Sequence, residues 1–390
     1  MDRRNSAQSP QAVADAFDQG RLTQARQLAG MTKKDLAERI GVTPAAVGQY
    51  ETGVSRPRPD LVPRLADALG VPPAFFLLGR PHGRLDGSIA HFGSPRSARA
   101  YQRARAAAFV EQVWELAHAL ESQVGLPPVV LPGPSGGEVH SGVESPGDPA
   151  RAARALRRLW ELGTGPLSHL VRHMEAHGIV VVFLPPGEDD EDDKDTVTVD
   201  TFSTSRLPRP IVVLTANRCD DVHRHRFTAA HELGHLVLHG DAASGDVRQE
   251  READVFAAEF LTPRDSILPE LPDRLDLRGL VELKRTWGVP VDSLLHRCRE
   301  AGLISDSAAS RAHRRLKTLR DQPGFAAEPI GGHPDEQPVL LHRAFELAAS
   351  QTGLTTELLA AQLAWPVSRV RELLDLPDLP DHRPALRPVP

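Results

Sequence analysis

Hydrophobic positions over residues 22–78 recur at the three- and four-residue spacing of helices, in several short segments. Thr32 and Thr43 each precede one of these segments as a helix N-cap, and Pro44 occupies a first helical position. Gly41 marks the turn between the two helices. The pattern therefore predicts a small all-helical domain. Its expected core consists of Leu36, Ala37, Ile40, Val47, Leu65, Leu69 and Phe75.

A different pattern begins near residue 150. Residues 151–177 contain two amphipathic helical segments. The continuous apolar run 178–185 predicts a buried strand, the alternating run 196–202 a half-exposed one, and the run 209–215 another strand. Helical spacing then resumes. Strands followed by helices in this order predict an α+β domain with a small sheet.

Three segments between these domains have other patterns. Residues 81–95 are punctuated by Gly and Pro, which predicts a connector. Residues 96–124 predict one long helix with an apolar stripe, which serves as a spacer or dimerisation helix or packs within the chain. Residues 126–149 are rich in Pro, Gly and Ser and predict a flexible linker.

The last eighty or so residues are helical and interrupted by proline, with a poorly defined linker near 322–338. Residues 355–376 predict two short helices about a Trp-Pro turn. This segment is either another helix-turn-helix-like element or a small helical interaction element. The second interpretation is favoured, because only Arg369 and Arg371 extend a basic side chain from the second helix.

Composition indicates the cellular compartment and shows how charge is distributed along the chain. No run of eighteen apolar residues occurs and the first residues lack a signal-peptide core, so we expect a cytoplasmic protein without a membrane segment. Cys219 and Cys298 form no disulfide framework; a small buried apolar role is favoured over a thiolate ligand. The net charge is -6, yet residues 1–105 hold 16 Lys and Arg against 9 Asp and Glu. A nucleic-acid contact is therefore expected in that part.

The stretch 226–239 carries the clearest chemistry. It contains His231-Glu232-Leu233-Gly234-His235, and two histidines four residues apart share one helix face, so both imidazoles reach a single metal ion. Glu232 follows the first ligand and can take a proton from a metal-bound water. His239 continues the stripe but lies too far along an unbroken helix for direct ligation, so we expect it to support a ligand.

A second helical segment, 249–262, ends at a proline and is expected to supply the third ligand. Glu250 and Asp254 share a face, so Glu250 can bind the metal while Asp254 accepts the free N–H of a ligand histidine. Glu252 is the weaker alternative, because it points elsewhere on the helix.

Other polar clusters favour ordinary explanations. His169, His173 and His177 are also four apart, but no acidic residue accompanies them, which favours surface histidines over a metal site. The acidic run 188–195 is best explained as a solvated loop.

The sequences RFTAAHELGHLVLHG and EREADVFAAEFLTP resemble the ImmA/IrrE family of metallopeptidases, over roughly residues 151–303. In that family a zinc-dependent protease cleaves a helix-turn-helix repressor and derepresses its genes. The resemblance implies a zincin-like scaffold, with His231, His235 and Glu250 as ligands of zinc or another divalent ion and Glu232 as the base. Asp254 stands where asparagine is common in the family.

The run LAERIGVTPAAV resembles the Xre (Cro/repressor) class of helix-turn-helix domains. The resemblance implies that residues 43–50 form the helix that reads the major groove, with Gln49 as the best base reader. It also implies a structural ion pair between Arg26 and Glu51. The side chains expected at the DNA are Lys33, Lys34, Thr43, Pro44, Ala45, Gln49, Arg56 and Arg58. Binding to another protein by this domain stays an alternative.

The expected architecture is multidomain. An all-α helix-turn-helix domain spans 19–80, a connector helix and linker 81–149, an α+β zincin-like metalloprotease domain with a small sheet 150–305, and a helical region 306–390. The expected partners are a double-stranded DNA operator and an Xre-type repressor as substrate, with a homodimer possible. Two alternatives remain: a transcription factor whose metal domain senses and cleaves nothing, and a protein-binding antirepressor or antitoxin-like partner. Candidate oxyanion donors are His223, His225 and Arg226.

Overall fold

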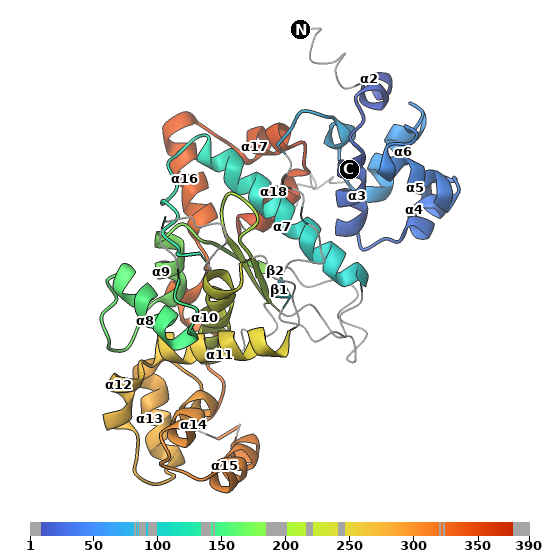
Figure 1. Cartoon of the computed structure of the whole chain (residues 1–390). Coiled ribbons are helices and arrows are strands. Elements are labelled where there is room, and N and C mark those ends of the chain that lie inside the picture. The colour runs from blue at the N-terminus through green and yellow to red at the C-terminus, as the bar shows by residue number, and fades with distance from the viewer. Residues whose placement is uncertain are drawn as a thin grey trace, which may run out of the picture. The chain divides into compact units, whose positions relative to one another are not determined.

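The computed structural model (Figure 1) describes residues 9–81, 83, 85, 91–92, 100–133, 142, 145–184, 201–215, 221–240, 246–319, 321–322 and 324–376. The chain divides into two compact units. Unit 1 comprises residues 1–82, 115–125 and 341–390, and unit 2 comprises residues 83–114 and 126–340. None of the helices in the described ranges is both long enough and apolar enough to cross a membrane.

The N-terminal part of unit 1 is an all-helical domain, as predicted. Its elements are α2 (Pro10–Asp15), α3 (Gln19–Leu28), α4 (Lys33–Ile40), α5 (Pro44–Thr52), α6 (Leu61–Leu69) and the 3-10 helix η1 (Pro73–Phe76). Thr32 and Asp35 form a reciprocal capping box at the start of α4, and Gly41 ends that helix with φ of 68°. All seven predicted core side chains are buried.

The long helix α7 (Ala100–Glu121) begins four residues later than the predicted start, and residues 93–99 lie outside the described ranges. Its residues 100–114 belong to unit 2 and the remainder to unit 1. The apolar stripe of the helix is buried, with Phe109 2% and Val113, Leu116 and Leu120 0% exposed. The stripe therefore packs within the chain, so it does not offer a dimerisation face.

A buried polar cluster ties α7 to the N-terminal helices of unit 1. Arg21 of α3 has no exposed surface and pairs with Glu115 of α7. Gln24 donates to the same carboxylate at 2.9 Å, and Arg80 approaches its other oxygen at 3.8 Å. Removing either member of such a pair would leave an unpaired buried charge, so the contact fixes α3 against this end of α7.

Unit 2 holds a four-stranded sheet in the order β1-β3-β4-β2. Strand β2 (Val180–Leu184) pairs with β4 (Ile211–Thr215) in parallel, and β3 (Phe202–Thr204) pairs with β4 antiparallel. Strand β1 (His91–Phe92) pairs antiparallel with β3 at the edge. The prediction of a connector over residues 81–95 is wrong for residues 91 and 92, which form strand β1. A strand of two residues is too short to show a hydrophobic pattern in the sequence, and it is defined by its pairing with β3. Residues 196–200 of the predicted middle strand lie outside the described ranges.

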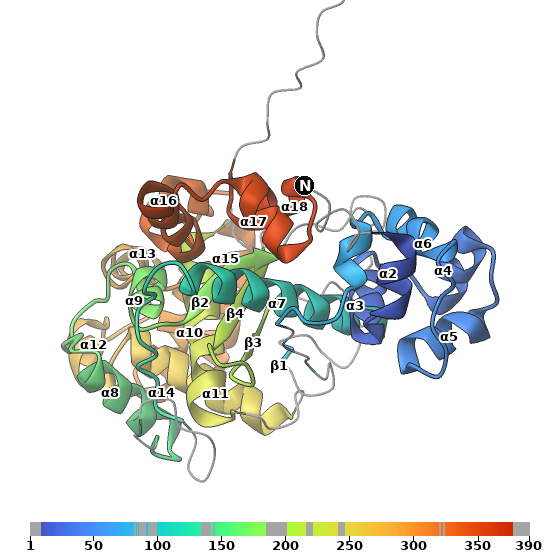
Figure 2. The same cartoon turned by 90° about the horizontal axis from the view of Figure 1, so that it is seen from above.

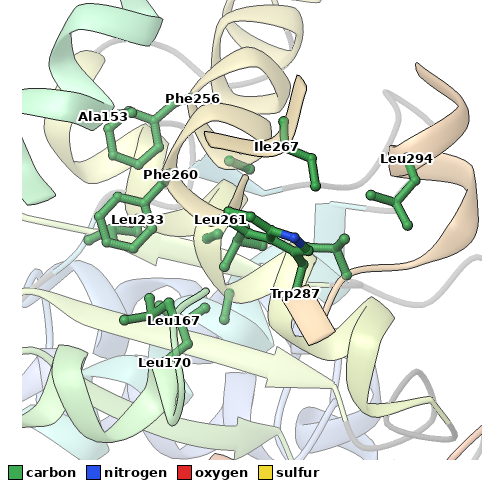
Figure 3. Close-up of a cluster of buried hydrophobic side chains, with 14 of the residues drawn as sticks. Ala153, Leu167, Leu170, Leu233, Phe256, Phe260, Leu261, Ile267, Trp287 and Leu294 are labelled. Carbon is green, nitrogen blue, oxygen red and sulfur yellow. The ribbon is translucent and has the colours of Figure 1, made fainter. Parts of the chain in front are cut away.

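Unit 2 also contains a series of helices. They are α8 (Pro149–Leu159), α9 (Leu170–Ala176), α10 (Val222–Leu238), α11 (Val247–Leu261), α12 (Arg264–Ile267), η4 (Leu268–Glu270), α13 (Leu277–Trp287), α14 (Val291–Glu300), α15 (Asp306–Leu319), η5 (Ile330–Gly332) and η6 (Pro334–Glu336). Figure 1 shows α10 and α11 side by side. Figure 3 shows the core that they share, where Phe256 and Phe260 stack with ring centres 5.7 Å apart.

Part of the segment predicted as a flexible linker belongs to this core. Leu131 is 1% exposed, and the Trp160 indole donates to the Val130 carbonyl at 2.7 Å. Gly178 has φ of 82°, and a Cβ there would lie 2.6 Å from the Pro128 carbonyl oxygen. Residues 126–133 are therefore ordered by contacts with residues far along the chain, which a Pro- and Gly-rich composition does not reveal.

The C-terminal part of unit 1 contains α16 (Leu340–Thr352) except its first residue, together with α17 (Thr356–Leu363) and α18 (Val367–Leu373). The Trp-Pro turn predicted between two short helices lies between α17 and α18, and Trp365 is 3% exposed. The helical character of the C-terminal region is therefore confirmed over the residues described.

Candidate metal centre

Helix α10 brings the two motif histidines to the same point. Asp221 caps its N-terminus, and the helix runs without interruption through His231 and His235. Their Nε2 atoms lie 3.1 Å apart, and the two rings meet edge to face. Gly234, the residue before His235, packs against α11, where an added Cβ would lie 3.0 Å from the Phe256 side chain. A side chain at that position would therefore require Phe256 to shift by a few tenths of an ångström.

Helix α11 supplies a carboxylate to this point. One Glu250 oxygen lies 3.3 Å from His231 Nε2 and the other 3.7 Å from His235 Nε2. A tetrahedral ion bound at about 2.0–2.1 Å holds its ligand atoms about 3.3 Å apart. The three groups therefore have the separations that one divalent ion requires. Among the described residues, they are the only trio of His, Cys, Asp or Glu so arranged.

The Nδ1 atoms of the two rings, which face away from Glu250, contact another acidic side chain and another histidine. Asp254 accepts from His231 Nδ1 at 2.9 Å, which is the position predicted for it. His239 Nδ1 lies 3.0 Å from His235 Nδ1. Glu252, the weaker alternative ligand, instead contacts His239 Nε2 at 3.1 Å. Both Nε2 atoms are thus left facing Glu250, and the contacts on Nδ1 fix ring orientation.

The electrostatics of the trio favour a cation. Burial alone would lower the pKa of His231, but the hydrogen bonds that its ring donates to Asp254 and Glu250, together with the charge of Glu232, raise that pKa to about 10. Burial would likewise raise the pKa of Glu250, yet its hydrogen bonds to the two histidines hold that pKa far below the usual range. Without an ion, a proton on His231 therefore compensates the carboxylates, and a metal must displace it.

Metal affinity is accordingly expected to rise with pH. Since His231 is protonated below a pKa of about 10, binding at pH 7 releases that proton, and affinity gains about tenfold per pH unit in this range. Titration calorimetry with zinc in two buffers of different ionisation enthalpy measures the protons released. Binding without proton release would contradict this electrostatic description.

Glu232 occupies a different position from an open, solvated base. Its side chain has no exposed surface, and its carboxylate faces strand β3. Thr201 donates to one carboxylate oxygen at 2.9 Å, and Ser203 of β3 donates to the other at 2.8 Å. Ionised carboxylate oxygens accept more than one hydrogen bond each, so both retain acceptor capacity. The two hydroxyls fix the orientation of the carboxylate.

Thr201 and Ser203 were not predicted from the sequence. They lie about thirty positions before Glu232 and meet it only because β3 packs on α10. The sequence offered only a weak signal. A buried carboxylate needs hydrogen-bond donors, and the predicted strand before the motif carries hydroxyl side chains that could supply them.

The three candidate oxyanion donors are engaged elsewhere. His225 Nε2 lies 3.1 Å from the Glu336 carbonyl oxygen, and His223 faces Glu328 at 3.5 Å. Arg226 is buried and pairs with the Glu336 carboxylate. His225 and Arg226 thus hold the start of α10 to Glu336, and His223 lies near Glu328 without a hydrogen bond, so none of the three is placed as an oxyanion donor in this structure.

The N-terminal domain presents most of its expected DNA-contacting residues at the surface. The ion pair expected between Arg26 and Glu51 is present. The side chains of Lys34 and Arg58 are 74% and 76% exposed. Lys33 also approaches Glu51, at 3.3 Å.

Helix α5, which is predicted to read the major groove, offers few hydrogen-bonding side chains. Pro44, Ala45 and Gln49 are exposed along it, while the Thr43 hydroxyl caps it by accepting from Ala46 N at 3.2 Å. Arg56, beyond that helix, donates to the Asp15 carbonyl oxygen. Gln49 thus remains the side chain best able to contact a base edge.

The other histidine, cysteine and acidic residues considered in the sequence either make ordinary structural contacts or lie outside the described residues. His177 stacks on Trp160 with ring centres 4.3 Å apart, and its Nδ1 lies 2.7 Å from the His173 carbonyl oxygen. Cys298 is buried, with 2% exposed. Cys219 and the acidic run 188–195 lie outside the described residues.

Two family models match the chain. Residues 174–299 match the IrrE N-terminal-like domain of peptidase family M78. Residues 22–76 match a helix-turn-helix model. No curated protein matches the chain. The first match contains the metal-centre residues on α10 and α11, and the second contains α4 and α5.

Proposed function

We propose that this chain, which joins an Xre-type helix-turn-helix domain to an IrrE-like domain of a metallopeptidase family, is a DNA-binding regulator that cleaves a helix-turn-helix repressor. The convergence of His231, His235 and Glu250 beside Glu232 carries this proposal. An ion held by two imidazoles and one carboxylate keeps a position open for water, as in hydrolytic zinc sites.

The proposed reaction is hydrolysis of a peptide bond. A divalent ion such as zinc, when bound, lowers the pKa of a coordinated water and polarises the scissile carbonyl. Glu232 takes the water proton and passes it to the leaving nitrogen. Thr201 and Ser203 keep the Glu232 carboxylate in the orientation for that transfer. Asp254 holds the His231 ring by its far nitrogen.

Ser203→Ala is expected to lower kcat of peptide hydrolysis by about tenfold to a hundredfold, the range for lost hydrogen bonds behind a metal site. KM should stay unchanged, because Ser203 is fully buried and cannot touch substrate. Steady-state kinetics measures both constants, and Ser203→Thr, which keeps a hydroxyl, should retain more activity. A rise in KM alone would contradict this role.

The helix-turn-helix domain is proposed to bring the peptidase domain to an operator. The exposed cations Lys34 and Arg58 suit phosphates, which give affinity and salt dependence but little discrimination between sequences. Gln49 can bond an adenine edge in two places. A repressor at the same or a neighbouring operator is then the nearest protein substrate.

The test is incubation of the zinc-loaded full chain with each helix-turn-helix repressor encoded beside its gene. Mass spectrometry of the products should reveal one defined cut in one repressor, absent with a chelator and restored by added zinc. Intact repressors after incubation with chain of full metal content would overturn the proposal.

One observation favours a second function, a transcription factor whose metal domain senses without cleaving. Glu232 is wholly buried and both of its oxygens already accept hydroxyl donors. Such a carboxylate could serve only to organise the site. Under this alternative, Glu232→Gln leaves metal-dependent gene control intact, whereas control that requires cleavage is lost with the same substitution.

A further inference from the structure

Helix α15 carries a group of exposed cations that neither family match covers. The peptidase match ends at residue 299, before the helix begins. The only acidic residue of the helix is Asp306 at its first position, which approaches Arg299 of α14 at 3.8 Å. The next acidic residue, Asp321, follows the end of the helix. Between them lie four exposed cations, which we term the cationic face: Arg311, Arg314, Arg315 and Lys317.

Packing within unit 2 fixes which side of α15 faces solvent. Ala309 and Ala312 are 3% and 2% exposed, and Leu316 packs against the hydrophobic core of unit 2. His313 contacts Asp292 of α14 at 2.7 Å. Residues 309, 312 and 316 are three and four apart and therefore share one helix face. The cations lie on another face, which the fold presents to solvent.

The cationic face has no counter-charge within the described part of the chain. None of its four side chains forms an ion pair or a hydrogen bond with a described residue. Two other helices of unit 2 instead place a carboxylate one turn from an exposed arginine. Arg285 pairs with Glu282 at 2.9 Å, and Arg248 pairs with Glu252 at 2.7 Å. The charge of α15 is therefore left for a partner outside the described residues.

The spacing of these cations makes them repel one another. Arg311 lies three and four residues before Arg314 and Arg315, and Lys317 lies three residues after Arg314. Like charges at these separations are neighbours on a helix surface and destabilise the helix. The chain as a whole has a net charge of -6, so this local excess of positive charge runs against its composition. A polyanionic partner removes the repulsion.

Duplex DNA is the polyanion whose dimensions and chemistry fit this face. Arginine, which provides three of the four cations, binds phosphate through two parallel hydrogen bonds. From residue 311 to residue 317 the helix rises about 9 Å, at about 1.5 Å per residue. A duplex of that length carries roughly five phosphates, since one charge occurs for about every 1.7 Å of its axis. The helix-turn-helix domain of the same chain brings such a duplex within reach.

We propose that the cationic face of α15 binds phosphates of duplex DNA, as a second contact beside that of the helix-turn-helix domain. Phosphate contacts position a protein without selecting a sequence, so this contact holds unit 2 on DNA that flanks the operator. Since both contacts belong to one chain, the first raises the effective concentration for the second. The inference rests on the proposed DNA binding of this chain and does not depend on cleavage of a repressor.

The test measures the affinity of the full chain for a mixed-sequence duplex over a series of salt concentrations. The first variant replaces three of the cations: Arg311→Gln/Arg314→Gln/Arg315→Gln. Its plot of log affinity against log salt should be less steep by about 2–3, because each lost phosphate contact removes about 0.9 from the slope. A second variant keeps the charge and should keep the slope: Arg311→Lys/Arg314→Lys/Arg315→Lys.

A matched control removes the same charge from other exposed arginines of unit 2, on α8 and α13: Arg151→Gln/Arg158→Gln/Arg278→Gln. Figures 1 and 2 both show α8 apart from α15. The control should bind with the slope of the unaltered chain, because its three positions do not form one face with α15. Circular dichroism of each variant checks that the helices are retained.

Three outcomes overturn the proposal. The first is an unchanged slope in the glutamine variant of α15. The second is an equal loss of slope in the control, because net charge and not one face would then be responsible. In the third, the acidic run 188–195 of the chain covers the face. Lys317 would then resist acetylation without DNA, and replacing the carboxylates of that run by amides would make it reactive.

A separate variant distinguishes failure of this inference from failure of the proposed DNA binding by the helix-turn-helix domain. Lys34→Gln/Arg58→Gln removes two exposed cations of that domain and should also make the plot less steep, by about 2. An unchanged slope in this variant, beside a reduced slope in the α15 variant, would remove the phosphate contacts proposed for the helix-turn-helix domain and leave the contact of α15 standing.

Discussion

Glu232→Gln is expected to leave the metal content of the chain unchanged while lowering peptide hydrolysis by about 10²–10⁴-fold, the contribution of a positioned general base. Glutamine keeps the size of the side chain and accepts a hydrogen bond from Thr201 or Ser203, so the buried site stays filled. It cannot take the proton of a metal-bound water. Single-turnover cleavage of a repressor measures the loss of hydrolysis, and the zinc content of the same sample measures whether metal binding is unchanged.

Glu282→Gln is the matched control, because Glu282 is an exposed carboxylate of unit 2 with 71% of its side chain accessible. It should leave cleavage unchanged. Cleavage by Glu232→Gln at the rate of this control would remove Glu232 from the chemistry. The buried carboxylate would then only organise the domain.

Arg226→Met is expected to destabilise unit 2 by about 3–5 kcal/mol, the cost of leaving a buried charge without its partner. The Arg226 guanidinium pairs with Glu336, and its Nε donates to the Gly288 carbonyl at 2.9 Å. Glu336 also accepts from the backbone of Leu170 at 3.1 Å. One buried contact therefore joins α10, α9 and η6 at the end of the metal helix. Hydrogen exchange of α10 amides across a urea series measures the loss.

Arg285→Met provides the comparison. Arg285 is paired with Glu282 at the surface of α13, at 2.9 Å, and its side chain is 53% exposed. Exposed pairs contribute about 0–1 kcal/mol, so this variant should behave nearly as the unaltered chain does. A similar small effect for Arg226→Met would contradict the structural role assigned to the buried pair.

The parts of this fold that the sequence predicts are those with local causes. The caps Thr32 and Thr43, the turn at Gly41 and the helical spacing of the metal-centre segments all act within a few residues. Helix periodicity explains why Glu250 can meet the two histidines once α10 and α11 lie side by side. That α10 and α11 are neighbours could be predicted only from the resemblance to a known family.

The features that escaped prediction depend on contacts between distant residues. Strand β1 exists through its pairing with β3, and Leu131 is ordered by the core of unit 2. Thr201 and Ser203 reach Glu232 across tertiary packing. Residues 355–376 were predicted as two short helices, but the kind of element stayed open between two alternatives. Its turn carries Ala364 in place of glycine, so the usual sequence signal of the turn is missing.

We propose above all that two imidazoles and the Glu250 carboxylate hold one divalent ion. Zinc content of the purified full chain, after dialysis against limiting zinc, tests it most directly when Glu250→Ala is compared with Glu252→Gln. Glu252 contacts His239 instead of the ion-facing nitrogens, so it is the matched control. One zinc per chain is expected for the unaltered protein and for Glu252→Gln, with a clear loss for Glu250→Ala. Full zinc content in Glu250→Ala, or none in the unaltered chain, would contradict the claim.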